Sequence, residues 1–248
     1  LYLAHHAPHT PVEAKAELVD HYRRKLKPGM RHQNPTYAAM VHSLDESVGR
    51  VMAELPDRRI EDRTVVIFTS DNGGYLQASD GTKVTTNHPL RSGKGSLYEG
   101  GVRVPLIVKW PGVTRAGAES GEPVVSTDLY RTLADAAGVP AGGDGMSLQP
   151  VLRDPSARLD RDALYFHYPH YYATTSPVSA IRARDWKLLH YHEDGHVEMF
   201  NLAQDPGEEH DLAARMPGKA DELKAKLDRW LRSVDAQRPE PNPRYSKP

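Results

Sequence analysis

The sequence predicts an α/β layer over residues 1–157, a small antiparallel sheet with one covering helix over residues 158–236, and an extended tail over residues 237–248. Three observations support this. Two apolar runs, at residues 64–69 and 104–108, are bounded by glycine-rich segments and are typical of buried strands. A helical pattern precedes the first run, which is the alternation of α/β proteins. After the boundary at 157, short runs separated by turn residues replace this order.

The bulk composition is ordinary for a globular protein and excludes several classes. The 248 residues are 38% hydrophobic and 26% charged, with a formal net charge of −1. This charge gives no general electrostatic attraction to nucleic acid or to an anionic membrane. No stretch approaches the roughly 20 apolar residues of a spanning helix. Without cysteine there is no disulfide, no thiolate metal site and no cysteine nucleophile within these residues.

Residues 1–4 are an apolar run that predicts a strand, and this run leads into the segment HHAPHTP, which contains His5, His6 and His9. A strand that ends in a loop rich in histidine and proline is typical of an active-site edge, although a loop with unrelated histidines has the same composition. The chain begins inside this run, with leucine and no signal peptide, so we expect a piece of a longer protein.

The clearest helix is predicted over residues 34–55, where apolar side chains recur every three or four positions. Asn34 or Thr36 is expected to cap its first turn. The helix leads through a charged connection into the strand predicted at residues 64–69. A helix followed by a buried strand and a glycine-rich loop is the order in which α/β sites are built.

The second half of the chain contains one further helix and then the antiparallel sheet. The helix is predicted over residues 128–137 and ends at Gly138, a common C-terminal cap. Turn residues at Arg184-Asp185 and at 193–195 separate short runs that predict hairpins. The predicted strands are residues 163–168, 178–183, 186–192 and 197–201. Apolar spacing over residues 221–234 predicts the helix that covers one face of this sheet.

Polar residues between the two predicted core strands carry the chemistry. Ligands of α/β proteins bind beyond the carboxyl ends of parallel strands, and Asp71 and Asn72 follow the first strand directly. Their oxygens suit a hard cation such as Ca²⁺ or Mg²⁺, although Asp-Asn-Gly is also a common turn. Lys94 lies between glycines and is suited to an oxyanion, with a flexible basic loop as the alternative. With a histidine for proton transfer, the set fits hydrolysis of an anionic ester, phosphate or sulfate, but it includes no nucleophile.

The chain contains, in this order, LYLAHHAPHTP, NPTYAAMVHSLDESVGRVMAEL, SDNGG, GKGSLYEGGVRVPLIVKWPG, STDLYRTLADAAGVP, DGMSLQPVL and AIRARDWKLLHY. Together these segments resemble the type I sulfatases, the formylglycine-dependent arylsulfatases of the alkaline-phosphatase-like superfamily. The resemblance covers nearly the whole chain. It implies that residues 1–157 are the C-terminal half of a catalytic domain, with part of a mixed or parallel sheet flanked by helices.

The resemblance also implies roles for individual residues. Asp71 and Asn72 match the metal ligands of the family, for which Ca²⁺ is the usual ion and Mg²⁺ is possible. Lys94 matches the lysine that grips the sulfate group. His9 matches the sulfate-contacting histidine, a candidate proton donor to the leaving alcohol. It is preferred over the two earlier histidines because it directly precedes the x-Pro of the loop.

Further residues are candidates for substrate binding. His88 and Arg91 lie near Lys94 in the sequence, and His167 and His170 are candidates to reach the pocket from the C-terminal part. A structural or surface role is the alternative for the last two. Glu99, in a Glu-Gly-Gly segment, is interpreted as a structural acid in a turn.

The family nucleophile is the feature that this sequence lacks. In the family, formylglycine is made from the cysteine or serine of C/S-x-P-S-R, and the segment DPSAR at residues 154–158 does not match. We therefore expect the nucleophile upstream of this chain. In the whole enzyme the hydrated aldehyde would attack sulfur, and the 248 residues alone are predicted to be inactive.

The sequence leaves two other functions open. One is another alkaline-phosphatase-like hydrolase, such as a phosphodiesterase or a phosphonate hydrolase, and the other is a non-catalytic anion- or sugar-binding fragment. As a sulfatase, the protein is expected to act on a sulfated aryl compound or glycan, with no nucleic-acid or membrane partner. The resemblance implies a periplasmic or secreted location.

Overall fold

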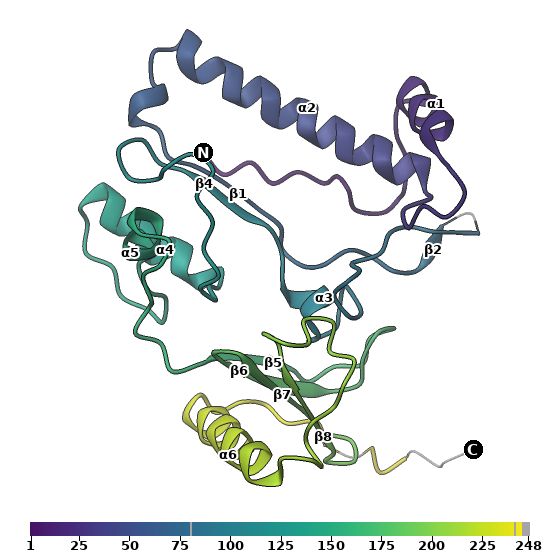
Figure 1. The fold of residues 1–248 in the computed structure, drawn as a ribbon, viewed down its shortest axis with the longest axis vertical. Helices are drawn as coiled ribbons and strands as arrows, with labels where there is room; N and C mark the ends of the chain where they lie inside the picture. The colour runs from purple at the N-terminus through teal and green to yellow at the C-terminus, as the bar shows by residue number, and fades with distance from the viewer. Residues whose placement is uncertain (80, 241, 245–248) are drawn as a thin grey trace.

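A long helix packs over the first part of the molecule (Figure 1). The computed structural model describes residues 1–79, 81–240 and 242–244. Helix α2 spans Pro35–Asp57, and the Asn34 side chain accepts a hydrogen bond from the Tyr37 backbone N–H at 2.9 Å. Asn34 therefore caps the helix, as one of the two predicted alternatives. Helix α1 (Ala16–Lys25) packs beside α2, where Tyr22 Oη lies 3.1 Å from His42 Nδ1.

The predicted core strands pair with each other, but in an antiparallel direction. Strand β1 (Val66–Thr69) pairs with β4 (Leu106–Lys109), so that Thr69 lies opposite Leu106. This corrects the expectation that the site loops follow the ends of parallel strands. A parallel pair needs a crossover of a dozen or more residues, usually a helix, whereas the only helix between β1 and β4 in the described chain is the short α3 (Glu99–Val102). As a result, the end of β1 and the start of β4 lie at one edge.

Residues 1–4, which the sequence predicts to be a strand, do not form one in the structure. These residues pair with no strand among the described residues, and the side chains of Leu1 and Tyr2 are exposed. An apolar run alone does not make a strand, because a strand needs a hydrogen-bonded neighbour. The segment instead leads as an extended chain into the turn at His6–His9, where the His9 N–H donates to the His6 carbonyl at 2.9 Å.

Short elements lie before, within and after the segment from β1 to β4. A 3₁₀ turn (Glu61–Arg63) precedes β1, and a small hairpin, β2 (Ala78–Ser79) with β3 (Thr82–Lys83), follows it. The predicted second helix is α4 (Thr127–Ala137), which ends at Gly138 with φ 67° as expected of this cap. Helix α5 (Gln149–Arg153) follows and contributes Val151 to a small core with Leu148 and Leu159.

The predicted antiparallel sheet is confirmed. Its strands are β5 (Leu164–Tyr168), β6 (Val178–Ala183), β7 (Trp186–Tyr191) and β8 (Val197–Asn201), hydrogen-bonded in that order. Helix α6 covers one face, as predicted, but it spans Pro217–Ser233 because Pro217 starts the helix earlier than the apolar spacing indicates. The tail residues 237–240 and 242–244 form no helix or strand, and 241 and 245–248 lie outside the described residues.

The two faces of this sheet bury two different cores. On one face, Ile181, Leu188 and Met199 pack against leucines of α6. On the other face, Phe200 and its neighbours pack against Leu97 and Tyr98, which directly precede α3. Alternating side chains of a strand point to opposite faces, which explains this division. The second core joins the sheet to the loop between β3 and α3. The domain boundary at residue 157 stays a prediction.

Within the described residues, no helix combines the length and the apolar character that crossing a membrane requires.

Candidate active site

The Asp71-Asn72 turn lies at the end of β1 and is held against α3 through glycine contacts. Asp71 Oδ1 accepts a hydrogen bond from the Asn72 backbone N–H at 3.0 Å. The next residue, Gly73, donates its N–H to the Gly101 carbonyl at 2.9 Å. A Cβ at Gly73 would lie 1.7 Å from the carbonyl oxygen of Gly100, so only glycine allows this close approach. The turn is therefore fixed at the same edge as the start of β4.

Asn87 joins the Asp71-Asn72 turn to the Lys94 loop. Its Oδ1 accepts a hydrogen bond from the Gly74 N–H at 2.9 Å, and its Nδ2 donates to the carbonyls of Gly74 at 3.2 Å and Ser92 at 3.0 Å. The Lys94 N–H donates to the same Gly74 carbonyl at 3.1 Å. Asn87 has no recognisable signal in the sequence, because it is a single asparagine in a polar loop.

His9 and Lys94 meet in the structure although 85 residues separate them in the sequence. Lys94 Nζ lies 3.1 Å from His9 Nε2, and His9 Nδ1 lies 2.8 Å from the Thr10 carbonyl oxygen. A carbonyl only accepts, so Nδ1 carries the proton and the neutral ring accepts from the lysine ammonium through Nε2. Of the other two histidines, His5 contacts Ser47 at 2.9 Å and His6 lies edge-on to His9 with ring centres 5.4 Å apart.

Asp71 and Asn72 fit part of a metal shell. One carboxylate and one amide oxygen are the donor types that Ca²⁺ and Mg²⁺ prefer, and each ion needs six or more oxygen ligands in all, including waters. In the part of the chain that the structure describes, no group of three or more histidine, cysteine, aspartate or glutamate side chains is arranged to hold an ion. The residues present therefore fit a hard cation that takes further ligands from elsewhere.

Arg91 and His88 lie on the same loop, but the structure uses Arg91 for internal contacts. The Arg91 Nη1 donates to the Glu208 carbonyl at 2.9 Å, and the guanidinium lies 4.0 Å from the centre of the Tyr98 ring. These contacts join the loop to the C-terminal part. His88 is exposed and lines an open cavity of about 440 Å³ together with Arg91 and Glu209. Substrate binding by either residue stays a prediction.

His167 and His170 do not join the other candidates. His167 lies on β5 with Nδ1 2.7 Å from Ser179 Oγ and Nε2 2.6 Å from the Gln237 carbonyl. On β6, Ser179 lies between Val178 and Ala180, which pack in the core with Tyr98. Ser179 and His167 therefore lie on the opposite face of the sheet, the one that α6 covers. His170 is exposed and lies edge-on to Tyr168, with ring centres 5.5 Å apart. Both histidines have the structural or surface setting that the sequence left open.

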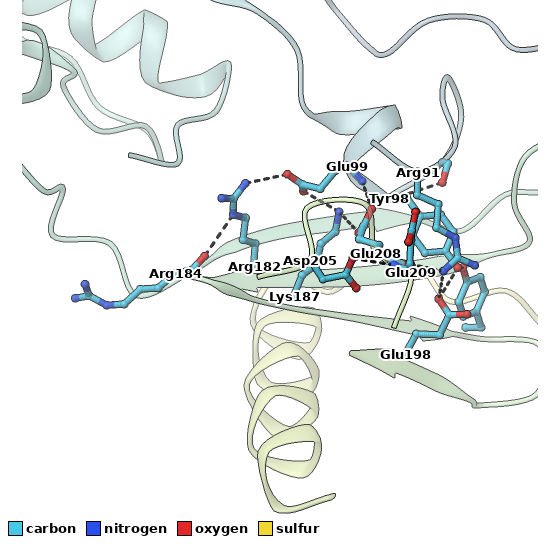
Figure 2. Close-up of polar contacts among 12 residues, drawn as sticks. Arg91, Tyr98, Glu99, Arg182, Arg184, Lys187, Glu198, Asp205, Glu208 and Glu209 are labelled. Carbon is cyan, nitrogen blue, oxygen red and sulfur yellow. Dashed lines mark hydrogen bonds and ion pairs between the residues drawn. The ribbon is translucent and has the colours of Figure 1, made fainter. Parts of the chain in front are cut away.

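A buried ion cluster fixes α3 to the C-terminal sheet (Figure 2). Lys187 Nζ lies 2.9 Å from Glu99 Oε1 and 3.0 Å from Glu208 Oε1, and all three side chains are buried. Arg182 Nη1 reaches Glu99 Oε2 at 3.2 Å, and the Glu99 backbone N–H donates to Glu208 Oε2 at 2.6 Å. Glu99 is thus a structural acid, as the sequence indicated, but it lies in a short helix rather than a turn.

Two protein-family models match this chain. The model of the family described as Sulfatase matches residues 1–139. The chain belongs to the sulfatase family. A second model, described as the C-terminal part of N-sulphoglucosamine sulphohydrolase, matches residues 92–237. The second match begins two residues before Lys94, so it includes the loop that the C-terminal sheet packs against.

Individual sulfatases are similar over much of the chain. A sulfatase of Formosa agariphila is 37% identical over 257 aligned residues, which cover 93% of this chain and 45% of that protein. Human steryl-sulfatase is 36% identical over 149 residues, covering 57% of this chain and 25% of that protein. This chain spans about half the length, or less, of the curated relatives it matches.

Solved structures show the same fold. The crystal structure of Ps i-CgsB superposes with a TM-score of 0.78 and 34% identity, covering 97% of this chain and 51% of that chain. The structure of BT4656 in complex with its substrate D-glucosamine-2-N,6-O-disulfate gives a TM-score of 0.68 and 30% identity, covering 89% of this chain and 46% of that chain. The predicted class, part of an alkaline-phosphatase-like α/β fold with a small C-terminal sheet, is therefore confirmed.

Proposed function

We propose that the whole protein is a sulfuric ester hydrolase and that this chain supplies its sulfate-binding pair and part of its metal site. The observation that carries the proposal is the 3.1 Å contact between Lys94 Nζ and His9 Nε2. The hydrogen bond from the Lys94 N–H to the Gly74 carbonyl ties this pair to the turn that contains Asp71 and Asn72. An ammonium, an imidazole and two hard oxygen ligands at one edge suit a compact, multiply charged oxyanion.

Lys94 and His9 have complementary tasks in this proposal. The ammonium has three N–H donors, of which one points to His9, so two remain for sulfate oxygens. Charge on these oxygens and on the leaving oxygen grows in the transition state, where fixed donors stabilise it. With a second proton, taken from solvent at Nε2, His9 no longer accepts from the Lys94 ammonium and can donate that N–H to the oxygen of the leaving alcohol as the S–O bond breaks.

Asp71 and Asn72 would hold the metal, for which we propose Ca²⁺, with Mg²⁺ as the alternative. When bound, the ion supplies positive charge for the sulfate oxygens and the nucleophile. We propose that the nucleophile is a formylglycine outside this sequence, and that residues 1–248 alone do not turn over substrate. Both assignments rest on the family, and the oxygen donor set supports the first.

A sulfated carbohydrate is the substrate class that the solved relatives favour, with an aryl sulfate as the second possibility. BT4656 was solved with D-glucosamine-2-N,6-O-disulfate, and Ps i-CgsB with k-i-k-neocarrahexaose. We further propose that the protein is periplasmic or secreted, that it needs no nucleic-acid or membrane partner, and that residues 158–236 form its C-terminal subdomain.

The test uses the full-length enzyme with a chromogenic aryl sulfate and with 6-O-sulfated glucosamine. We expect Lys94→Ala and His9→Ala each to lower kcat/KM at least about 100-fold, because each removes a charged or proton-donating group from the transition state. Lys83→Ala, in the exposed β3 strand, and His21→Ala, on α1, are the matched controls and should keep wild-type rates. Asp71→Ala should abolish the recovery of activity when Ca²⁺ is returned to chelator-treated enzyme.

The alternatives give different results. A phosphodiesterase would hydrolyse bis-p-nitrophenyl phosphate faster than the aryl sulfate. A non-catalytic anion-binding protein would retain any trace of hydrolysis in Lys94→Ala and His9→Ala. Turnover of an aryl sulfate by the isolated 248 residues with Ca²⁺ would overturn the assignment of the nucleophile to a segment outside this chain.

A further inference from the structure

The backbone of Lys94 is held from two sides. On one side its N–H donates to the Gly74 carbonyl at 3.1 Å, which belongs to the glycine-rich turn after β1. On the other side its carbonyl accepts a hydrogen bond from Thr174 Oγ1 at 2.7 Å. Thr174 is partly buried and lies in the connection between β5 and β6, 80 residues further along the chain. A residue of the C-terminal sheet region therefore bonds directly to the residue proposed to grip sulfate.

The neighbouring Gly95 is covered by an aromatic ring from the same connection. A Cβ on Gly95 would lie 2.1 Å from Cδ1 of Tyr172, so the ring occupies the space that a side chain would need. Gly95 also has φ +84°, a conformation that favours glycine. Tyr172 and Thr174 thus contact two consecutive residues of the loop, one through packing and one through a hydrogen bond.

The connection that carries Tyr172 and Thr174 is closed by two backbone hydrogen bonds. The Tyr172 N–H donates to the Thr175 carbonyl at 3.0 Å, and the Thr175 N–H donates back to the Tyr172 carbonyl at 3.1 Å. The strands on either side, β5 and β6, belong to the sheet that the buried Lys187–Glu99 contact fixes to α3 (Figure 2). The Lys94–Glu99 segment is therefore anchored to the sheet at both ends.

From these contacts we propose that Thr174 and Tyr172 are positioning residues for sulfate ester hydrolysis, which hold the Lys94-Gly95 backbone so that the ammonium stays at His9 and at the anionic group of the substrate. This inference rests on the proposed function. Neither side chain needs to touch the substrate. Their effect is on the placement of Lys94 Nζ, and displacements of about 1 Å in a catalytic group can cost roughly 100-fold in rate.

The decisive variant is Thr174→Val, which keeps the shape of the side chain and removes its hydroxyl. Thr64→Val is the matched control, because Thr64 Oγ1 also donates to a backbone carbonyl, that of Ile60, at 2.6 Å and is also partly buried. In the full-length enzyme we expect Thr174→Val to lower kcat about tenfold with a smaller change in KM, because the partly buried Lys94 carbonyl loses its partner and the loop shifts. Thr64→Val should keep the wild-type kcat, and Thr174→Ser should restore it.

Tyr172 supplies the second arm. Tyr172→Phe keeps the ring on Gly95 and should retain wild-type kcat, whereas Tyr172→Ala removes the ring and should lower kcat as Thr174→Val does. Thermal unfolding of every variant separates a general loss of folding from misplacement of Lys94. Suppose that the wild-type enzyme hydrolyses sulfate esters and that Lys94→Ala lowers this activity. Equal kcat values for Thr174→Val and Thr64→Val would then overturn this inference alone. A wild-type enzyme that hydrolyses no sulfate ester overturns the inference and the proposed function together.

Discussion

Lys187→Met tests the buried cluster that fixes α3 to the C-terminal sheet. The ammonium lies 2.9 Å from Glu99 Oε1 and 3.0 Å from Glu208 Oε1, and the lysine side chain is 1% exposed. At an effective dielectric constant of about 20, each pair attracts by about 5 kcal/mol, and the desolvation of the three charges cancels much of this. Methionine fills a similar volume without the charge, so Glu208 loses its ion pair with Lys187 and Glu99 keeps only the one with Arg182. We expect the free energy of unfolding to fall by about 3–5 kcal/mol at pH 8.

The loss should depend on pH in a defined direction. Burial already raises the pKa of Glu208 above its ordinary value, although Lys187 opposes this. Without the lysine this pKa rises further. A carboxyl group with a higher pKa in the folded state binds its proton more tightly when folded, so stability is lost as pH rises from the unfolded value through the folded value. Lys187→Met should therefore be less destabilising at pH 5 than at pH 8.

Urea unfolding of the full-length enzyme, followed by tryptophan fluorescence, measures both effects. Two of the three tryptophans in these 248 residues, Trp186 in β7 and Trp230 in α6, report on the C-terminal sheet and its helix. Lys226→Met is the control, because Lys226 pairs with Asp162, whose side chain is 71% exposed, and such a pair contributes less than about 1 kcal/mol. A loss below about 1 kcal/mol for Lys187→Met, or an equal loss at both pH values, would refute the reasoning.

Three further predictions concern single residues. Gly95→Ala places a methyl group on the Tyr172 ring at φ +84° and should lower kcat for a sulfate ester at least about tenfold, whereas Gly218→Ala, in open space on α6, should leave kcat unchanged. Asn87→Ala removes three hydrogen bonds and should lower the thermal unfolding temperature by several degrees, with Asn87→Asp, which keeps only the acceptor, in between; equal temperatures for all three proteins would contradict this. Burial lowers the pKa of His190 to about 4, so stability is complete above pH 6.5 and should fall by about 2 kcal/mol as pH drops toward 4; a wild-type profile in His190→Asn would argue against it.

Much of the fold follows from local patterns. The α2 helix, the hairpins of the C-terminal sheet and the cap at Gly138 each depend on spacing or on a turn residue, and these signals are present in the sequence itself. Helix α1 carries a weaker signal, because no side chain caps its first turn and none of its residues is buried. The direction of β4 relative to β1 depends on the path of the chain between them, which local patterns do not encode.

The sequence likewise indicates some residues of the candidate site and not others. Lys94 and His9 were identified by resemblance, and the structure brings their side chains together, while their catalytic roles stay predictions. No local pattern indicates Asn87 or Thr174, because their hydrogen bonds reach residues 13 and 80 positions away. For His167 the sequence leaves substrate binding and a structural role open, and in the structure both of its ring nitrogens contact groups of the C-terminal part. Substrate binding by His167 stays a prediction.

The core formed by Leu97, Tyr98 and Phe200 has a genetic consequence. Through this core, the loop proposed to bind sulfate packs against the apolar face of the C-terminal sheet. Substitutions that loosen β6, β7 or β8 will therefore be recorded as losses of activity, although these strands hold no residue that we assign to the chemistry. In a collection of inactive variants, we expect a second cluster of lesions in this sheet, separate from the cluster around His9 and Lys94.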